Sequence, residues 1–143
     1  MNWLEELSEN KSLSTDLAAF FTQYGPDELK QALQLYEKAN QNYICKTKSS
    51  LDVLKICDIY YLQIAGHTIT VHTQDRNYQK YGTLSKELQA LSQYGFIKCN
   101  QSCLISLDKV KSITGSNVLM ENGDILHLSR NCTSKVIMAF SQY

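Results

Sequence analysis

Three short polar segments carry the side chains with which this chain could do chemistry. They are Gly66-His67-Thr68, the stretch from Lys98 to Ser102, and Ser129-Arg130-Asn131. Each is expected at a strand end or turn, because each adjoins an apolar or alternating run. Arginine can form two hydrogen bonds with guanine, glutamine two with adenine, and histidine one with a purine N7. The segments therefore fit contact with nucleic-acid bases, although each alone also fits a solvated loop or a local salt bridge.

The second segment lies inside the stretch from Phe96 to Asp108, which is apolar at both ends and polar in the middle. This pattern predicts a strand, a polar corner and a second strand. The corner offers amide, hydroxyl and ammonium groups but no carboxylate or histidine. Without an acid or base at the corner, the pattern favours binding over catalysis.

Sequence patterns typical of enzymes and metal sites are absent. There is no phosphate-binding glycine loop and no G-x-S-x-G motif, and the three histidines at 67, 72 and 127 lack metal-ligand spacing. We therefore expect no enzyme activity, no metal and no cofactor. A small enzyme that pairs a lone Ser or Cys with a distant His is the least favoured alternative.

The cysteines and the hydropathy indicate a cytoplasmic protein. None of the five cysteines, at 45, 57, 99, 103 and 132, forms a C-x-x-C pair, so reduced thiols in a reducing compartment are expected. No apolar run approaches the roughly 18 residues of a membrane span, and the first residues lack the basic region of a signal peptide.

The net charge of zero conceals two parts of opposite sign. Residues 1–42 contain three Lys against seven Asp or Glu, whereas residues 43–143 contain eleven Lys or Arg against seven acids. Such asymmetry predicts different partners for the two parts, and the basic part suits a polyanion. We expect a helical extension over 1–42 and a separate domain over 43–143.

The spacing of apolar residues predicts two helices in the extension. Leu13, Leu17, Phe20, Phe21 and Tyr24 form one stripe, for which Ser12 or Ser14 is the expected N-cap. Gly25 ends this helix and Pro26 suits the first position of the next, so we expect an antiparallel helical hairpin. Two short helices cannot bury both stripes alone. They must pack on the second domain, on a second copy or on another partner.

The rest of the chain predicts a mainly β domain with one internal helix. Thr83 is the expected N-cap of a helix over 84–92, and a short helix is expected near 136–140. Asn122-Gly123 predicts a tight hairpin turn. The predicted strands are 43–47, 51–56, 59–65, 68–73, 77–81, 103–107, 110–114, 117–121 and 125–129.

Several motifs of this domain together resemble the LytTR family of bacterial DNA-binding domains, over about residues 44–140. Asp58-Ile59-Tyr60-Tyr61-Leu62 resembles the opening strand of the family, and Gly82 to Leu88 its T-L-x-x-L helix. The most specific family signature is F-x-R-x-H-x-S-x-[IL]-[VI]-N. The matching positions here are Phe96, Lys98, Ser102, Leu104 and Ile105. Val71-His72-Thr73, Asn122-Gly123 and Leu128-Ser129-Arg130 match further family blocks in order.

The departures from the family pattern fall inside that signature. Lys98 replaces Arg, Asn100 stands where His is usual, Gln101 where Asn or a basic residue is common, and Ser106 where Asn is usual. The resemblance therefore implies DNA binding with a changed preference for base sequence.

The resemblance implies elongated antiparallel sheets with a short helix, and loops that enter successive major grooves of double-stranded DNA. It implies base contacts by His67, Gln101 and Arg130. The implied backbone or supporting contacts are Lys98, Asn100, Ser102, Asn131 and Lys135. It also makes Cys99 a candidate redox switch, against the alternative of a buried structural thiol.

We therefore expect a stand-alone LytTR-type transcriptional regulator without a receiver domain, which binds promoter repeats as a homodimer or as paired copies. The helical extension is a candidate surface for self-association or for a regulatory partner such as a membrane protein. The alternative is a protein-interaction module or anti-regulator that keeps the fold and has lost DNA binding.

Overall fold

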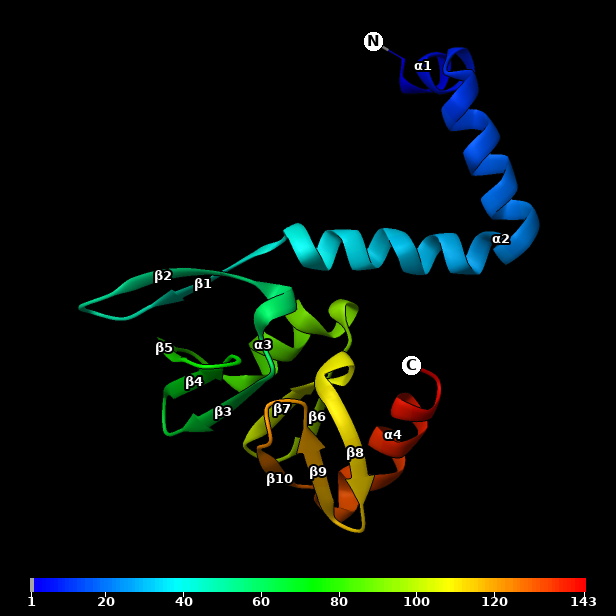
Figure 1. Cartoon of the computed structure of the whole chain (residues 1–143). Coiled ribbons are helices and arrows are strands. Elements are labelled where there is room, and N and C mark those ends of the chain that lie inside the picture. Colours follow the sequence, from blue (N-terminus) through cyan, green and yellow to red (C-terminus); the bar gives the residue numbers. More distant parts are fainter. Residues whose placement is uncertain (1) are drawn as a thin grey trace. The chain divides into compact units, whose positions relative to one another are not determined.

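The computed structural model describes residues 2–143, which form two compact units, and each unit is considered by itself. Of the described residues, 2–37 belong to the first unit and 38–143 to the second (Figure 1). Among the described residues, no helix is long and apolar enough to cross a membrane.

The first unit is helical and has almost no interior. It contains α1 (Trp3–Glu9) and most of α2 (Lys11–Asn40). Asn10 caps α2 by accepting a hydrogen bond from the Leu13 backbone N at 2.9 Å, so the expected caps Ser12 and Ser14 are wrong and lie inside the helix. None of residues 2–37 is buried.

Gly25 divides α2 into the two predicted helical segments. Its φ of 84° lies in the left-handed region that glycine tolerates, and Pro26 follows as the first residue of the second segment. The joint is shorter than the two to five residues of an αα-hairpin loop. Figure 1 shows the two segments diverging from it.

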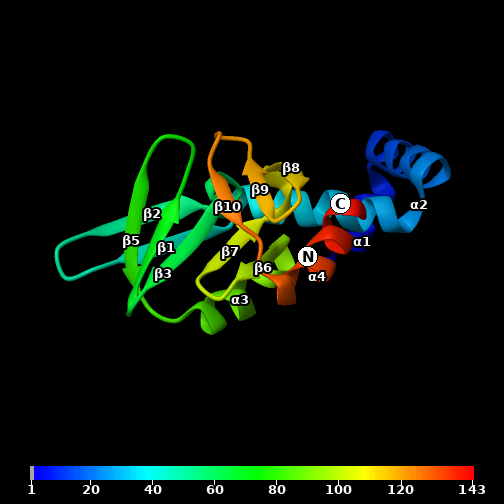
Figure 2. The same ribbon diagram turned by 90° about the horizontal axis from the view of Figure 1, so that it is seen from below.

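The second unit contains three antiparallel sheets. A two-stranded sheet pairs β1 (Asn42–Lys46) with β2 (Leu51–Lys55), and a three-stranded sheet has the order β10-β9-β8. The central sheet has the order β5-β4-β3-β7-β6. Figure 2 labels four of its strands, β5, β3, β7 and β6. Its strands are β3 (Tyr61–Ala65), β4 (Thr68–His72), β5 (Asn77–Tyr81), β6 (Phe96–Asn100) and β7 (Cys103–Ser106). The strands of the three-stranded sheet are β8 (Val110–Thr114), β9 (Asn117–Met120) and β10 (Ile125–His127).

The helices and short 3-10 turns of the second unit lie between these strands. The 3-10 turns are η1 (Ile56–Asp58), η2 (Ser92–Tyr94) and η3 (Leu107–Lys109). Helix α3 (Leu84–Leu91) begins at the predicted cap, where Thr83 Oγ1 accepts from the Lys86 backbone N at 3.4 Å. Helix α4 (Arg130–Ser141) begins six residues before the segment expected to be helical.

The central sheet separates two hydrophobic cores, because side chains alternate between the faces of a strand. Leu62 and Leu104 belong to a core with β1 and α3, whereas Tyr61 and Ile105 belong to one with β9, β10 and α4. All four residues of β7 are buried. The fold is mainly β with an N-terminal helix pair, as the sequence predicts.

Candidate nucleic-acid interface

The β3–β4 turn and the β6–β7 turn lie side by side at one end of the central sheet. The antiparallel register of β3 and β7 pairs Gln63 with Cys103, so the end of one strand meets the start of the other. The Ile64 backbone N donates to the Ser102 backbone O at 2.9 Å. The two turns present His67 and Gln101, both of which are exposed.

The connection between β10 and α4 joins the same end of the sheet at β6. The Ser129 backbone N donates to the Cys99 backbone O at 2.9 Å. Arg130 and Asn131 follow as the first residues of α4, and both are exposed. We call residues 66–67, 100–102 and 127–131 the turn cluster. The structure thus brings together the three polar segments singled out in the sequence.

Asn100 connects two parts of the turn cluster through its side chain. Its Nδ2 donates to the His127 backbone O at 2.8 Å, and its Oδ1 accepts from the Ser102 backbone N at 2.9 Å and from Ser102 Oγ at 3.1 Å. Both ends of the amide are therefore engaged within the protein. Asn100 shapes the β6–β7 turn and holds the β10–α4 connection against it.

Lys98 and Gln101 contact each other across the bulge in β6. Lys98 Nζ donates to Gln101 Oε1 at 3.2 Å, and the register of β6 with β7 shifts between Lys98 and Asn100. This contact holds the Gln101 amide beside a positive charge. The second lone pair of Oε1 and the Nε2 donors can still form the two hydrogen bonds that adenine requires.

The start of α4 adds backbone donors to the turn cluster. The first amides of a helix have no intrahelical partner and, together with the helix dipole, favour a phosphate group. The Ser129 side chain makes no capping hydrogen bond, although its backbone O accepts from Thr133 Oγ1 at 2.8 Å. Lys135 is exposed one turn after Asn131, on the same helix face.

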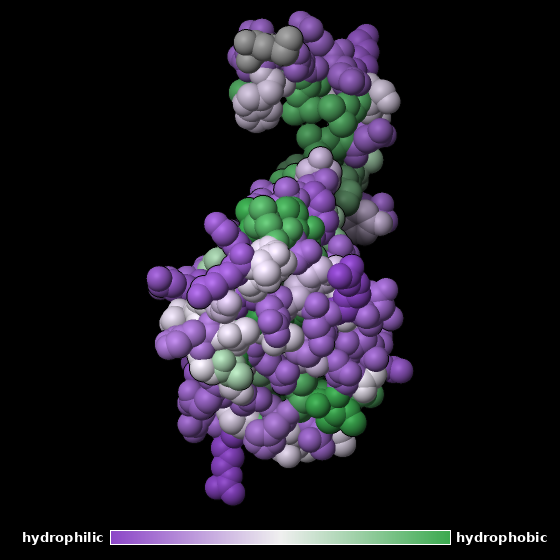
Figure 3. All heavy atoms as spheres, turned by 90° about the vertical axis from the view of Figure 1, so that its left-hand side faces the viewer, coloured by the Kyte–Doolittle hydropathy of each residue, from purple (hydrophilic) through white to green (hydrophobic). Residues whose placement is uncertain are grey.

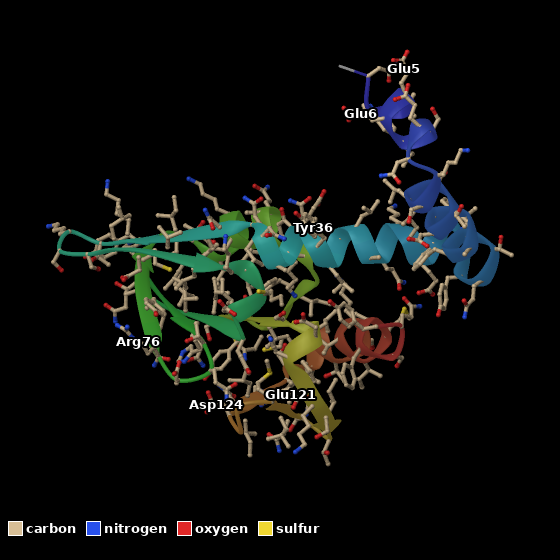
Figure 4. The ribbon with its side chains drawn as sticks, turned by 45° about the horizontal axis from the view of Figure 1, so that its top comes forward. Glu5, Glu6, Tyr36, Arg76, Glu121 and Asp124 are labelled. Carbon is tan, nitrogen blue, oxygen red and sulfur yellow. The ribbon has the colours of Figure 1, made fainter. Side chains whose placement is uncertain are left out.

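Carboxylates are concentrated at the opposite end of the central sheet. Asp58 precedes β3, Asp75 lies in the β4–β5 turn and Asp108 follows β7. Asp124, labelled in Figure 4, accepts a hydrogen bond at 2.7 Å from Tyr61 Oη at the start of β3. The turn cluster itself contains no acid. The sheet therefore presents a cationic and amide-rich end that suits an anion.

Glu87 on α3 is a carboxylate near the turn-cluster end of the central sheet, so its surroundings need explanation. It is buried, and it lies 2.7 Å from Lys80 Nζ and 2.6 Å from Tyr43 Oη. Burial and the hydrogen bond to Glu87 raise the pKa of Tyr43, so the phenol stays protonated as a donor. The negative charge of Glu87 is thus balanced inside the domain by Lys80 and by the hydrogen bond from Tyr43.

Sequence reasoning missed Lys86 and Lys38. Lys86 is exposed in the first turn of α3, which follows the end of β5 beside the β3–β4 turn, and the Gly82 backbone N donates to the His67 backbone O at 3.1 Å. The Gly82-Thr83 turn signal could have placed Lys86 there. Lys38 is structural, because its Nζ lies 3.0 Å from Asp108 Oδ2 and donates to Ser106 Oγ at 3.0 Å.

The cysteines of the described chain are all free thiols. Cys99 is 0% exposed and Cys103 is 1% exposed. The hydrogen bond to Cys99, together with burial, raises the pKa of Cys103. Redox sensing by Cys99 stays a prediction, and its burial limits the access of an oxidant to the sulfur. Within residues 2–143, no group of three His, Cys, Asp or Glu is placed to hold a metal ion.

Two comparisons with known proteins bear on the family and the fold of this chain. The sequence model of the LytTr DNA-binding domain matches residues 49–141. A solved structure, the LytTr DNA-binding domain of a putative methyl-accepting/DNA response regulator from Bacillus cereus, superimposes with a TM-score of 0.62 at 19% identity. The match covers 70% of this chain and 96% of that chain, and it shows a shared fold. No curated protein matches the sequence significantly.

Proposed function

The chain belongs to the family of LytTr DNA-binding domains, and on that premise we propose that it is a sequence-specific DNA-binding regulator of transcription. The turn cluster is the surface that enters the major groove of promoter DNA. The observation that carries the proposal is a pair of backbone hydrogen bonds, Ile64 to Ser102 and Ser129 to Cys99. They hold the three polar segments together at one end of the sheet, in turns that contain no acid.

Three exposed side chains of the turn cluster have the chemistry for base contacts. Arg130 suits guanine because its planar guanidinium can bond O6 and N7 together. Gln101 suits adenine, and His67 suits a purine N7. These three residues come from three separate connections, so they would contact different base pairs.

The remaining polar groups suit the phosphate backbone and the support of the turns. Lys98, Ser102, Asn131 and Lys135, together with the first amides of α4, fit phosphate contacts. Asn100 fits a supporting role because both ends of its side chain are already bonded within the protein. Lys86 is an additional phosphate candidate.

Regulation is assigned to the N-terminal helices, which we propose pack on a second copy or on a regulatory partner. Residues 2–37 bury none of their own side chains, while Trp3, Leu33 and Tyr36 are 68%, 57% and 69% exposed. Paired copies on repeated half-sites would let one regulator recognise a longer promoter sequence. The site of action is the cytoplasm and no catalysis is involved.

A protein-interaction module that has lost DNA binding is the second candidate. The Lys98–Gln101 hydrogen bond favours it, because that contact partly occupies a base-contacting side chain within the protein. Such a module would bind a protein partner through the same exposed turns. The two candidates predict different responses to DNA and to salt.

Fluorescence anisotropy with duplexes from upstream of the chain's own operon separates them. A DNA-binding regulator binds one upstream fragment more tightly than a shuffled duplex of equal length, and its affinity falls as salt rises because phosphate contacts release counterions. The test variant is Arg130→Ala, which should reduce binding to that fragment. Equal and weak binding to all duplexes, with no salt dependence, would reject the DNA-binding proposal.

A further inference from the structure

The β1–β2 hairpin exposes an apolar face with a basic rim. Ile44, Leu51 and Val53 are 55%, 65% and 58% exposed, and Ile44 pairs directly with Val53 across the strands. The exposed lysines Lys46 and Lys55 flank these side chains in the same two strands. Figure 3 looks at the hairpin end of the molecule and shows hydrophobic surface bordered by hydrophilic groups.

The opposite face of the hairpin is anchored to the domain, so the exposed face cannot turn inward. Tyr43 and Cys45 are 7% and 0% exposed. Tyr43 Oη donates to Glu87 Oε2 at 2.6 Å, and Lys80 Nζ lies 4.4 Å from the centre of the Tyr43 ring. The apolar face therefore stays outside in the folded domain and needs a separate partner to cover it.

The helical unit has the complementary character. Residues 2–37 contain two Lys against seven acids, among them Glu5 and Glu6 on α1 (Figure 4). Large apolar side chains lie between these acids, and none of them is buried. A shallow hollow in this unit is lined by Phe20, Tyr24, Glu28, Gln31, Ala32 and Leu35. The unit thus pairs apolar surface with negative charge, where the hairpin pairs apolar surface with positive charge.

We propose that the acidic helical unit of one copy packs on the basic-rimmed face of the β1–β2 hairpin of a second copy, and that the exchange is reciprocal. Every copy carries both surfaces, so a two-fold dimer satisfies both of them twice and closes. Packing identical helical units on each other would instead bring two strongly acidic surfaces together. Charge complementarity therefore favours helix-to-hairpin contact.

The link between the two surfaces favours a second copy over the same chain. Gln41 alone separates α2 from β1. A return along the preceding helix usually needs a connection of two to six residues.

Each hairpin face would hide roughly 400 Å² of apolar and lysine-stem surface, and the two hairpins with their helical partners roughly 1,600 Å² in total. That is the size of a standard specific interface.

This inference deepens the proposed self-association, and its test is the mass of the full chain in solution without DNA. Light scattering after size exclusion should give a dimer for the wild type. Val53→Asp on the hairpin and Leu33→Asp on the helix should each raise the dimer dissociation constant by about tenfold or more. Ile125→Asp is the matched control, because Ile125 is 66% exposed on the separate three-stranded sheet.

Mixing the two variants gives the decisive result. Val53→Asp keeps its helical unit and Leu33→Asp keeps its hairpin, so the mixture should regain dimers through one restored contact. If Val53→Asp leaves the dimer dissociation constant unchanged, the result would overturn the proposal in favour of helix-to-helix packing. A monomeric wild type, or a mixture that stays monomeric, would overturn it as well.

Circular dichroism must show that each variant is folded, which is expected because all three sites are exposed. The result is distinguishable from the DNA proposal. A monomer leaves binding to a single half-site unaffected, and failure to bind DNA leaves the measured mass unchanged.

Discussion

Replacing Asn100 by Ala should loosen the turn cluster without removing a base contact. The substitution removes the hydrogen bond from Nδ2 to the His127 backbone O at 2.8 Å, and the two bonds to Oδ1 from Ser102 at 2.9 and 3.1 Å. It therefore frees the β10–α4 connection from the β6–β7 turn at the side-chain level, while the Ser129 to Cys99 backbone bond remains.

The expected loss of stability follows from these contacts. A hydrogen bond contributes about 0.5–1.5 kcal/mol net, and water can replace part of each bond because Asn100 is only half-buried. We expect the free energy of unfolding to fall by about 1.5–3 kcal/mol. DNA affinity should fall for every sequence alike, since Arg130 and Gln101 keep their side chains but lose a common fixed position.

Urea unfolding and anisotropy on a panel of single-base variants of the bound fragment test both parts. Ser102→Ala removes only one of the three bonds and should cost roughly 0.5 kcal/mol. Asn131→Ala, at an exposed position without a side-chain hydrogen bond in the structure, should leave the urea midpoint unchanged. An unchanged midpoint for Asn100→Ala, or a loss of selectivity at one base pair only, would refute the supporting role and point to direct base contact.

Further predictions concern four other side chains of the domain. Arg130→Ala should cost about 1–3 kcal/mol of DNA-binding free energy and relax selectivity at one base pair, and an unchanged selectivity on the same base panel would contradict its base-contacting role. Lys135→Ala should weaken binding to all sequences alike. In a salt titration it should lower the salt dependence by about one charge. Lys38→Ala leaves Asp108 without its cation at 3.0 Å and should lower stability by about 2–3 kcal/mol in urea unfolding, and a neutral effect would contradict the importance of this pair. Burial lowers the pKa of His72, so the unfolded chain binds the proton more tightly and stability should fall as the pH drops through about 6.5. Urea unfolding at two pH values, one on each side of this pH, should show a smaller fall in stability for His72→Gln than for the wild type. An equal fall in both proteins would refute the assignment of this pH dependence to His72.

Local chemistry allowed much of the fold to be predicted from the sequence. Thr83 caps α3 as expected, and Pro26 begins the second segment of α2. Most strands lie within a residue or two of their predicted bounds, because alternation and turn residues are local signals. The turn at Asn122-Gly123 is present but extends from Glu121 to Asp124, where the Asn122 side chain accepts from the Asp124 backbone N at 3.1 Å.

The features that escaped prediction depend on distant parts of the chain. The strand predicted ahead of the polar corner is β6, but its length was not predicted. Lys98 and Asn100 interrupt its apolar pattern, yet both belong to the strand and pair with β7 on either side of a bulge. The contacts of Lys38 could not be predicted, because its partners Ser106 and Asp108 are about seventy residues away in sequence. The start of α4 at Arg130 was missed because the polar residues there resemble a loop.

Only part of the candidate site could be predicted from the sequence, because its assembly also depends on distant parts of the chain. The residue types of the three polar segments were visible in the sequence, but their meeting at one end of the sheet depends on the pairing of β3 with β7. The sequence also offered no sign that the Asn100 side chain is bonded to the His127 backbone O. Of the two roles expected for Asn100, a contact with the DNA backbone or a supporting contact, we propose the supporting one.

The backbone hydrogen bonds of the turn cluster have a consequence for the divergence of binding specificity. Ile64 to Ser102 and Ser129 to Cys99 are bonds between main-chain atoms, which do not depend on the side chains at 67, 101 and 130. Those three positions can therefore change without disturbing the framework that presents them. A lineage could acquire a new operator by substitution at exposed positions alone, and the same property makes this domain a suitable scaffold for selecting altered target sequences.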